Sequence, residues 1–380
     1  MIYNNFCGEE ISAIGMGCMR LPLLSEDSSD IDTAQVDEMV DWAIERGVNY
    51  FDTAWGYHNG RSEVVTGASL ARHPREKWYI ASKFPGYDNS NFGNHEEIFQ
   101  KQLEKCGVDY FDFYLIHNVN ESNIEDYLAE DTYHTMEYFT KQKELGFIKH
   151  LGFSCHGDFD TFERFMEKYG DIMEFCQLQI NYQDWDFQDA KSKVAYLTER
   201  TIPIVVMEPL RGGHLIEFSE AEKEKLEALR PGISAPEWAY RYVQSVPGVR
   251  VTLSGMSTLE QCKQNIAIFE SEAPLNDEER QALYDISAAR LANDMVPCTS
   301  CRYCTEYCPI ELDIPVLIGL YNENLSKDDE HWMMFMKLHR FDADRQPSAC
   351  IACGSCAAVC PQQIDIPDVL AKLAQAAGQS

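Results

Sequence analysis

Residues 49–83 read NYFDTAWGYHNGRSEVVTGASLARHPREKWYIASK. The stretch begins with a short β-rich run at 49–53 and continues with an amphipathic helical pattern at 62–71. A second β-rich run follows at 78–83. A strand, a helix and a strand in this order predict one βαβ unit, whose two strands lie parallel. The same alternation continues along the chain on both sides of this stretch.

Eight β-rich runs recur in the first 290 residues, with amphipathic segments between them. The runs are Ala13–Met19, Asn49–Thr53, Trp78–Lys83, Phe111–His117, Ile148–Ser154, Cys176–Tyr182, Pro203–Glu208 and Arg250–Gly255. The clearest amphipathic segments are Thr33–Arg46, Ser62–Ala71, His95–Cys106, Asp158–Lys168 and Thr258–Phe269. Eight βα units of this length predict an α/β chain with a (β/α)8 TIM barrel over residues 1–290.

The alternative fold for this alternation is a doubly wound parallel sheet. Such a sheet usually carries a G-x-G-x-x-G turn after its first strand. Residues Ile14 to Cys18 begin a motif of this kind, but no third glycine follows. The barrel is therefore the favoured fold.

The composition excludes several classes of protein. The chain has 380 residues, of which 45% are hydrophobic, enough for one large domain and a smaller one. Its 32 Lys and Arg face 62 Asp and Glu, a formal charge of −30 that repels nucleic acids and anionic membranes. No apolar run approaches the ~18 residues of a membrane helix, and no secretory signal is visible. We expect a cytoplasmic protein with a small-molecule substrate.

The predicted strands end in polar or ionisable residues. These residues are Asp52, Lys83, His117, Ser154, Gln179 with Asn181, Glu208 and Ser254. In a (β/α)8 barrel the active site is built at the carboxyl ends of the strands. Polar residues are also common wherever a strand reaches the surface, but their coincidence on so many strands favours one shared active-site mouth.

Four short segments together resemble the aldo-keto reductase superfamily, and the resemblance extends over residues 11–270. The segments are Phe51–Tyr57, Gly60–Glu63, Ile80–Lys83 and Leu115–His117. The resemblance implies a barrel enzyme that interconverts a carbonyl and an alcohol with NAD(P)H. It also implies a catalytic tetrad made of Asp52, Tyr57, Lys83 and His117.

The chemistry of carbonyl reduction suits these four residue types. Hydride must reach the carbon and a proton must reach the oxygen, and the Tyr57 phenol supplies the proton if its pKa is lowered. A nearby Lys83 ammonium favours the phenolate and so lowers that pKa, while Asp52 holds the lysine. His117 would hydrogen-bond the substrate oxygen. Outside this pattern, a loop tyrosine and a core histidine would be the ordinary interpretation.

The resemblance further implies a nucleotide site. Its candidate residues are Gly17, Ser154, Gln179, Met207, Gly212, Gly213, Gln261 and Asn265. Ser154 and Gln179 match the carboxamide contacts of the family, and residues 209–213 resemble the loop that covers the pyrophosphate. Cys155 replaces the usual asparagine, Met207 the usual stacking aromatic, and Gly255 with Gln261 the basic residues that grip the 2′-phosphate of NADP. NADP and NAD therefore both remain open.

Eight of the 14 cysteines lie in the last 90 residues, in two copies of C-x2-C-x2-C-x3-C-P. The first copy is Cys298, Cys301, Cys304 and Cys308, and the second is Cys350, Cys353, Cys356 and Cys360. This spacing is typical of two [4Fe-4S] clusters, in which the fourth cysteine of each copy ligates the cluster of the other copy. A pair of zinc sites is the alternative, but zinc needs neither the third cysteine at this step nor the proline.

Residues 291–380 resemble the α-helical two-[4Fe-4S] ferredoxin domains that are appended to redox enzymes. Predicted helices begin at Asp313 and Asp365, each with a proline in the first turn, and another covers 328–339. We expect residues 371–380 to fray.

Three hypotheses of function remain open from the sequence. In the first, the barrel is a carbonyl–alcohol oxidoreductase whose clusters exchange electrons with a ferredoxin or flavoprotein partner. Because hydride carries two electrons and a cluster one, this requires a converter such as a flavin, and the sequence shows no flavin motif. In the second, the clusters only hold the helical domain together. In the third, the chain is an electron-transfer or docking subunit with an inactive barrel.

Overall fold

The computed structural model of the chain describes residues 1–25, 27–291, 295–299, 301–325, 338 and 341–379. By their contacts, the residues divide into two compact units. The first unit comprises Met1–Leu210 and Glu227–Asp277, and the second comprises Arg211–Leu226 and Glu278–Ser380.

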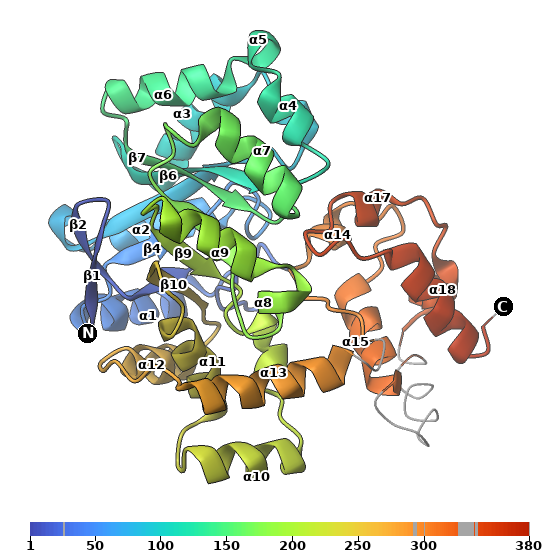
Figure 1. Ribbon diagram of the computed structural model, residues 1–380. Helices are drawn as coiled ribbons and strands as arrows, with labels where there is room; N and C mark the ends of the chain where they lie inside the picture. Colours follow the sequence, from blue (N-terminus) through green and yellow to red (C-terminus); the bar gives the residue numbers. More distant parts are fainter. Residues whose placement is uncertain (26, 292–294, 300, 326–337, 339–340, 380) are drawn as a thin grey trace. The chain divides into compact units, whose positions relative to one another are not determined.

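The first unit contains a closed barrel of eight parallel strands within the described residues, in the order β10-β3-β4-β5-β6-β7-β8-β9 (Figure 1). The strands are β3 (Ile14–Gly17), β4 (Tyr50–Asp52), β5 (Tyr79–Phe84), β6 (Phe111–Val119), β7 (Ile148–Cys155), β8 (Cys176–Gln179), β9 (Ile204–Met207) and β10 (Val249–Gly255). Their side chains are almost all buried, as in a parallel sheet covered on both faces. The predicted (β/α)8 barrel is confirmed.

Helices surround the barrel and follow the strands in sequence. They are α1 (Thr33–Glu45), α2 (Ser62–Leu70), α3 (His95–Cys106), α4 (Ile124–Leu128), α5 (Glu130–Tyr133), α6 (Thr135–Glu144), α7 (Phe159–Tyr169), α8 (Asp184–Phe187), α9 (Ala190–Glu199), α11 (Ala235–Gln244) and α12 (Leu259–Ile268). Two short 3-10 turns, η1 (Arg75–Lys77) and η2 (Asn89–Asn91), complete the loops. In α2, a Cβ at Gly67 would collide with the carbonyl oxygen of Cys106, so only glycine permits this approach of α2 to α3.

A short antiparallel hairpin of β1 (Tyr3–Phe6) and β2 (Glu9–Ser12) precedes the barrel, and the sequence did not predict it. The Phe6 side chain is fully buried and stacks on Phe113, with ring centroids 4.9 Å apart. Because Phe113 lies near the start of β6, the hairpin covers the amino-terminal end of the barrel. The carboxyl ends of the strands, where (β/α)8 barrels carry their active sites, lie at the opposite end.

The second unit is helical in its described part. Its elements are η3 (Arg211–Ile216), α14 (Tyr303–Glu306), α15 (Ile314–Leu325), η4 (Ala343–Arg345), η5 (Pro347–Ala349), α17 (Ser355–Ala358) and α18 (Ile366–Ala376). Two helices cross the boundary between the units: α10 (Glu220–Leu229) passes into the first unit at Glu227, and α13 (Asp277–Leu291) begins on its last residue. The core of the second unit holds Leu317 and Ile318 of α15 with Leu370 and Leu373 of α18.

The two halves of the cysteine-rich region repeat each other in backbone conformation. Arg302 and Gly354, each one residue after the second cysteine of its motif, both have positive φ and begin a one-turn helix. Glu311 and Gln363, each three residues after the fourth cysteine, also have positive φ. The internal duplication seen in the sequence is therefore also present in the structure.

Two of the predictions for this region need comment. The helix predicted at 328–339 lies outside the described residues, apart from Leu338. The prediction of a fraying end after residue 370 was wrong, because α18 continues to Ala376. Leu370, Leu373 and Ala377 form a buried stripe on this helix, and that apolar spacing stabilises it.

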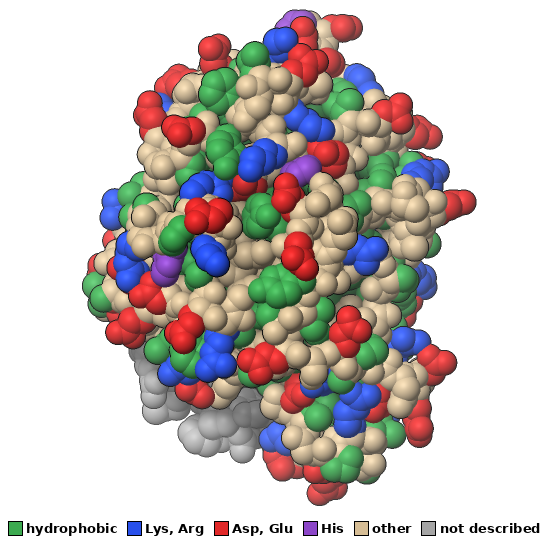
Figure 2. Space-filling view, turned by 90° about the vertical axis from the view of Figure 1, so that its left-hand side faces the viewer, with side chains coloured by type: hydrophobic (Ala, Val, Ile, Leu, Met, Phe, Trp, Pro, Cys, Tyr) green, Lys and Arg blue, Asp and Glu red, His purple; other side chains and the backbone are tan. Residues whose placement is uncertain are grey.

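The chain is acidic overall, with a formal net charge of −30. On the face shown in Figure 2, acidic and basic side chains are interspersed over the described residues. Among the helices that the structure describes, none combines the length and the apolar character needed to cross a bilayer.

Candidate functional site

The carboxyl ends of three neighbouring strands bring the predicted tetrad together. Asp52 ends β4, Lys83 lies near the end of β5, and His117 lies on β6. Tyr57 comes from the loop after β4, and its ring centroid lies 5.0 Å from Lys83 Nζ. The Tyr57 and His117 ring centroids are 6.1 Å apart at an interplanar angle of 79°. All four side chains are buried.

A buried ion pair lies at the centre of this group. Lys83 Nζ donates to Asp52 Oδ1 at 2.6 Å and to the Thr53 carbonyl oxygen at 2.7 Å. Burial raises the pKa of the Asp52 carboxyl, and the Lys83 ammonium acts in the opposite direction. Because either charge alone would be costly here, the two residues depend on each other. The ammonium is thus fixed beside the Tyr57 ring.

His117 is held in its neutral form. Burial lowers its pKa well below the ordinary value, and the positive charge of Lys83 adds to this. The ring packs edge-on against Tyr87 at 5.2 Å, and Tyr127 Oη donates to the His117 carbonyl oxygen at 3.0 Å. The buried Nδ1 has no hydrogen-bond partner. A neutral imidazole with an unused nitrogen suits a hydrogen bond to a substrate oxygen.

A buried hydrogen-bond network lies behind the tetrad and reaches the backbone of Lys83. Gln102 Nε2 donates to Glu63 Oε1 at 2.7 Å, to Ser82 Oγ at 3.0 Å and to the Lys83 carbonyl oxygen at 3.0 Å. Glu63 also accepts from Ser82 Oγ at 2.6 Å and pairs with Lys105 at 2.6 Å. The network ties α2 and α3 to the end of β5. Glu63 belongs to a segment that carried the family resemblance, but Gln102 gave no sequence signal.

The ends of β7 and β8 form a second polar group. Gln179 Nε2 donates to Asp184 Oδ2 at 2.7 Å, and the Ser154 hydroxyl accepts from the Asn118 backbone N–H at 2.8 Å. His156, which the sequence reasoning missed, hydrogen-bonds Gln179 and contributes to the lowered pKa of His117. Burial lowers the pKa of His156 itself to about 4.

The other predicted nucleotide contacts are more dispersed. Gly17 ends β3 and is paired with Asp52 and Gly255. Met207, at the end of β9, accepts a 3.6 Å hydrogen bond on its sulfur from Gln177.

On α12, Asn265 Nδ2 donates to Ser254 Oγ at 3.1 Å, and Gln261 Oε1 accepts from the Ser257 N–H at 2.8 Å. Gly212 and Gly213, with φ of +68° and +102°, belong to the second unit. The barrel unit by itself therefore assembles six of the eight predicted nucleotide contacts: Gly17, Ser154, Gln179, Met207, Gln261 and Asn265.

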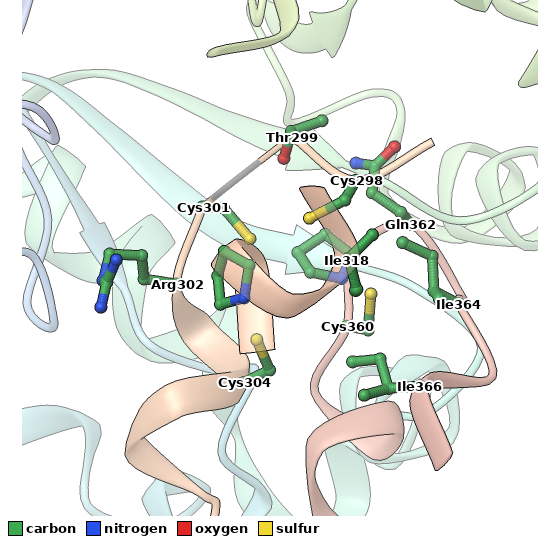
Figure 3. Close-up of a pocket in the computed structure, with 12 residues that line it drawn as sticks. Cys298, Thr299, Cys301, Arg302, Cys304, Ile318, Cys360, Gln362, Ile364 and Ile366 are labelled. Carbon is green, nitrogen blue, oxygen red and sulfur yellow. The ribbon is translucent and has the colours of Figure 1, made fainter. Parts of the chain in front are cut away.

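Eight thiols gather at two places in the second unit. Cys298, Cys301 and Cys304 line one pocket together with Cys360 of the other motif, and we call this site one (Figure 3). Burial raises the pKa of the Cys304 thiol, and the neighbouring thiols raise it further.

Site two is the complementary set. Cys350, Cys353 and Cys356 line a pocket with Cys308 of the first motif. Burial raises the pKa of Cys356 to about 11, whereas hydrogen bonds from Ser355 lower the pKa of the exposed Cys353. Four sulfur donors around each pocket fit the ligand set of an iron–sulfur cluster, and the exchange of the fourth cysteine follows the predicted pattern.

Comparison with known proteins agrees with both units. A family model described as the aldo/keto reductase family matches residues 13–288, and one described as a 4Fe-4S dicluster domain matches residues 297–364. An uncharacterized oxidoreductase of Bacillus subtilis, YqkF, is 27% identical over 307 residues, which are 72% of this chain and 92% of that protein. This chain covers 58% of the length of a probable aldo-keto reductase 1 of Glycine max and 45% of the length of an aldo-keto reductase of Mycolicibacterium vanbaalenii.

Two solved structures share the barrel fold. An aldo-keto reductase of Bacillus halodurans has a TM-score of 0.61 at 23% identity, covering 75% of this chain and 96% of that chain. An aldo-keto reductase of Klebsiella pneumoniae in complex with NADPH has a TM-score of 0.60 at 20% identity, covering 76% of this chain and 96% of that chain. The family match spans more than half of the sequence. The chain therefore belongs to the aldo/keto reductase family and is an oxidoreductase of that family with a C-terminal 4Fe-4S dicluster domain.

Proposed function

We propose that this chain interconverts a small carbonyl compound and its alcohol with NAD(P)H, and that two [4Fe-4S] clusters connect it to a one-electron carrier. The observation that supports the first part best is the buried Lys83–Asp52 pair beside the rings of Tyr57 and His117. A barrel that had lost its activity would gain nothing from keeping this costly pair of buried charges. The inactive docking subunit is therefore the weaker hypothesis.

Each residue of the tetrad has a distinct task. The Tyr57 hydroxyl gives its proton to the carbonyl oxygen, and the Lys83 ammonium stabilises the phenolate that results. Asp52 holds and orients the lysine through the 2.6 Å contact. Neutral His117 donates one N–H to the same oxygen and fixes the carbonyl in place. NAD(P)H, when bound, supplies the hydride for the carbonyl carbon.

The nucleotide would lie at the ends of β7, β8 and β9. Ser154 and Gln179 would hold the carboxamide, with Met207 on the next strand, and Asn265 would contact the adenine. NADPH in the Klebsiella pneumoniae structure supports this class of cofactor. Neither Gly255 nor Gln261 offers a basic side chain for the 2′-phosphate of NADPH. NADH and NADPH should therefore both be assayed as hydride donors.

The cluster sites would be filled by Cys298, Cys301, Cys304 and Cys360 at site one and by the other four cysteines at site two. Each cluster takes up one electron at a time, whereas hydride carries two. We therefore propose that a flavoprotein or a ferredoxin is the redox partner. A flavin, bound to the partner or to this chain, would accept the two electrons of a hydride and pass them on one at a time.

A structural role for the clusters is the second candidate, and one observation favours it. The Cys304 and Cys356 side chains are buried in the core of the second unit, among residues such as Leu317 and Leu370. A cluster there would stabilise the fold of the unit whether or not it carries electrons.

Tyr57→Phe tests the tetrad. We expect carbonyl reduction to fall by at least about 100-fold, because the proton donor is lost, while nucleotide affinity stays within about threefold. Tyr79→Phe, on a tyrosine near the amino-terminal end of β5, is the control and should leave turnover unchanged. Unchanged turnover in Tyr57→Phe would remove the tetrad from the mechanism.

Cys304→Ser and Cys356→Ser distinguish the two roles of the clusters. Anaerobic protein should first contain about eight iron and eight sulfide per chain, and a colourless zinc protein would contradict the assignment. Loss of reaction with a one-electron carrier, with NAD(P)H-dependent reduction retained, supports electron transfer. Loss of both activities together with the fold of the second unit supports the structural role.

A further inference from the structure

A buried arginine links the two chain segments that form site one. Arg211 lies in the 209–213 loop that resembled a pyrophosphate cover, yet it belongs to the second unit and is only 2% exposed. Its Nη1 donates to the Pro297 carbonyl oxygen at 2.7 Å, and its Nη2 donates to Gln362 Oε1 at 2.7 Å. The guanidinium therefore has fixed partners on two distant parts of the sequence.

Both partners adjoin ligands of the same site. Pro297 immediately precedes Cys298, and Gln362 comes two residues after Cys360 and itself lines the pocket (Figure 3). These are the two segments that must meet for the fourth cysteine to cross from one motif to the other. Arg211 joins them with two hydrogen bonds from one planar group, a geometry that lysine cannot reproduce.

Site two has no charged side chain among the described residues that line it. Its described lining is apolar apart from the thiols. Arg345 donates to Glu311 Oε2 at 2.6 Å, but its side chain is 43% exposed. The two sites thus differ in that a buried arginine hydrogen-bonds the segments of site one, whereas the described lining of site two holds no charged side chain.

We propose that Arg211 positions site one and raises the reduction potential of the cluster bound there. The proposal rests on the cluster assignment of the proposed function. Adding an electron to a cluster with four thiolates makes it more negative, so a nearby buried cation stabilises the reduced form. Arginine keeps its charge at every accessible pH, so the effect is permanent.

Arg302 also lines site one, but it should matter less. Its side chain is 51% exposed and pairs with Asp313 at 3.2 Å. Water and the carboxylate screen that charge. Arg302→Gln is therefore a matched control, with the same residue type at the same site but outside the protein interior.

The test is a potentiometric titration of the full chain, followed by EPR, on wild type, Arg211→Gln and Arg302→Gln. At the potential that half-reduces the wild-type cluster, Arg211→Gln should lower the ratio of reduced to oxidised cluster about tenfold, which equals about 59 mV for one electron. Arg302→Gln should change it less than threefold. Only one of the two reduction steps should move, and Cys301→Ser should move the same step.

The outcomes distinguish a failure of this inference from a failure of the proposed function on which it rests. Wild-type protein without about eight iron contradicts the cluster assignment itself. Full iron with unchanged potentials in Arg211→Gln overturns only the role of Arg211. If Arg211→Gln cannot hold its iron, Arg211→Lys decides the charge effect. Retained iron with a ratio of reduced to oxidised cluster within threefold of wild type supports it, and retained iron with a ratio tenfold lower overturns it. Loss of iron in Arg211→Lys as well supports the positioning role, because lysine lacks the planar group.

Discussion

The barrel mouth and the cysteine-rich unit gather their chemical groups in opposite ways. The tetrad comes from three neighbouring strands and the loop after β4, and its two charges pair with each other, with Lys83 Nζ at 2.6 Å from Asp52 Oδ1. In the second unit, three of the four thiols of each site lie within a few consecutive residues, and burial together with neighbouring thiols raises the pKa of Cys304 and of Cys356. The tetrad therefore holds opposite charges that pair with each other, whereas we expect bound metal to stabilise the thiolates of the cysteine-rich unit.

The largest expected effect follows directly from that difference. Removing iron with an oxidant and a chelator should unfold the second unit, because metal binding there supplies folding free energy, about 10 kcal/mol or more for small metal domains. Hydrogen exchange of amides in α15 and α18 should accelerate, while amides in β5 and β6 keep their protection. Unchanged protection in α15 and α18 would show that the hydrophobic core alone holds this unit.

The barrel should instead be sensitive to single charges. Lys83→Met leaves the Asp52 carboxylate buried without a cation, so we expect the free energy of unfolding to fall by about 3–5 kcal/mol in urea titrations. Lys101→Met removes an exposed pair with Glu97 and should cost less than about 1 kcal/mol. The double variant Lys83→Met with Asp52→Asn should recover part of the loss. An equal loss in the free energy of unfolding for Lys83→Met and Lys101→Met would contradict the contrast between a buried and an exposed charge.

Much of this contrast was predictable from the sequence, for a physical reason. Parallel strands buried on both faces are continuous apolar runs, and all eight were found with their polar ends. The cysteine spacing is local, so it also predicted which thiols the structure brings together. The β1–β2 hairpin was missed because Tyr3–Phe6 and Glu9–Ser12 are short and mostly polar.

The remaining residues depend on contacts that no local pattern shows. His156 is a single histidine after a strand, and only the packing against Gln179 reveals its place near His117. Arg211 lies in a glycine-rich loop that resembled a phosphate-binding segment. Its partners Pro297 and Gln362 are far away in the sequence, so only the fold identifies it as part of the cysteine-rich unit.

The barrel should also lose stability in acid through His156. Its folded pKa of about 4 lies below the ordinary value of 6.5, so the unfolded chain binds the proton more readily. This contribution is fully present above pH 6.5 and is lost as the pH falls to about 4, by up to about 3 kcal/mol. His156→Gln should flatten the stability profile between these values, whereas His134→Gln, at an exposed position, should not. Identical profiles for wild type and His156→Gln would exclude this origin of the acid sensitivity.

The smallest effect tests whether the buried network positions the tetrad or only stabilises the barrel. Gln102→Leu keeps the approximate side-chain volume but removes the hydrogen-bond donor to the Lys83 carbonyl oxygen. It also removes the acceptor of the Tyr114 hydroxyl, which lies 2.6 Å from Gln102 Oε1 in the wild type. We expect a loss of about 1–3 kcal/mol in the free energy of unfolding. Gln264→Leu, which removes an exposed bond to Glu260, is the control and should change little.

Catalysis separates the two roles of Gln102. If the network positions Lys83, kcat should fall several-fold in Gln102→Leu with KM nearly constant, and the alkaline limb of the pH–rate profile should move upward as Tyr57 loses part of its neighbouring charge. If the network only stabilises the barrel, kcat and the pH profile of the folded variant remain those of wild type. Such a result would mean that the Lys83–Asp52 pair needs no further support from α2 and α3.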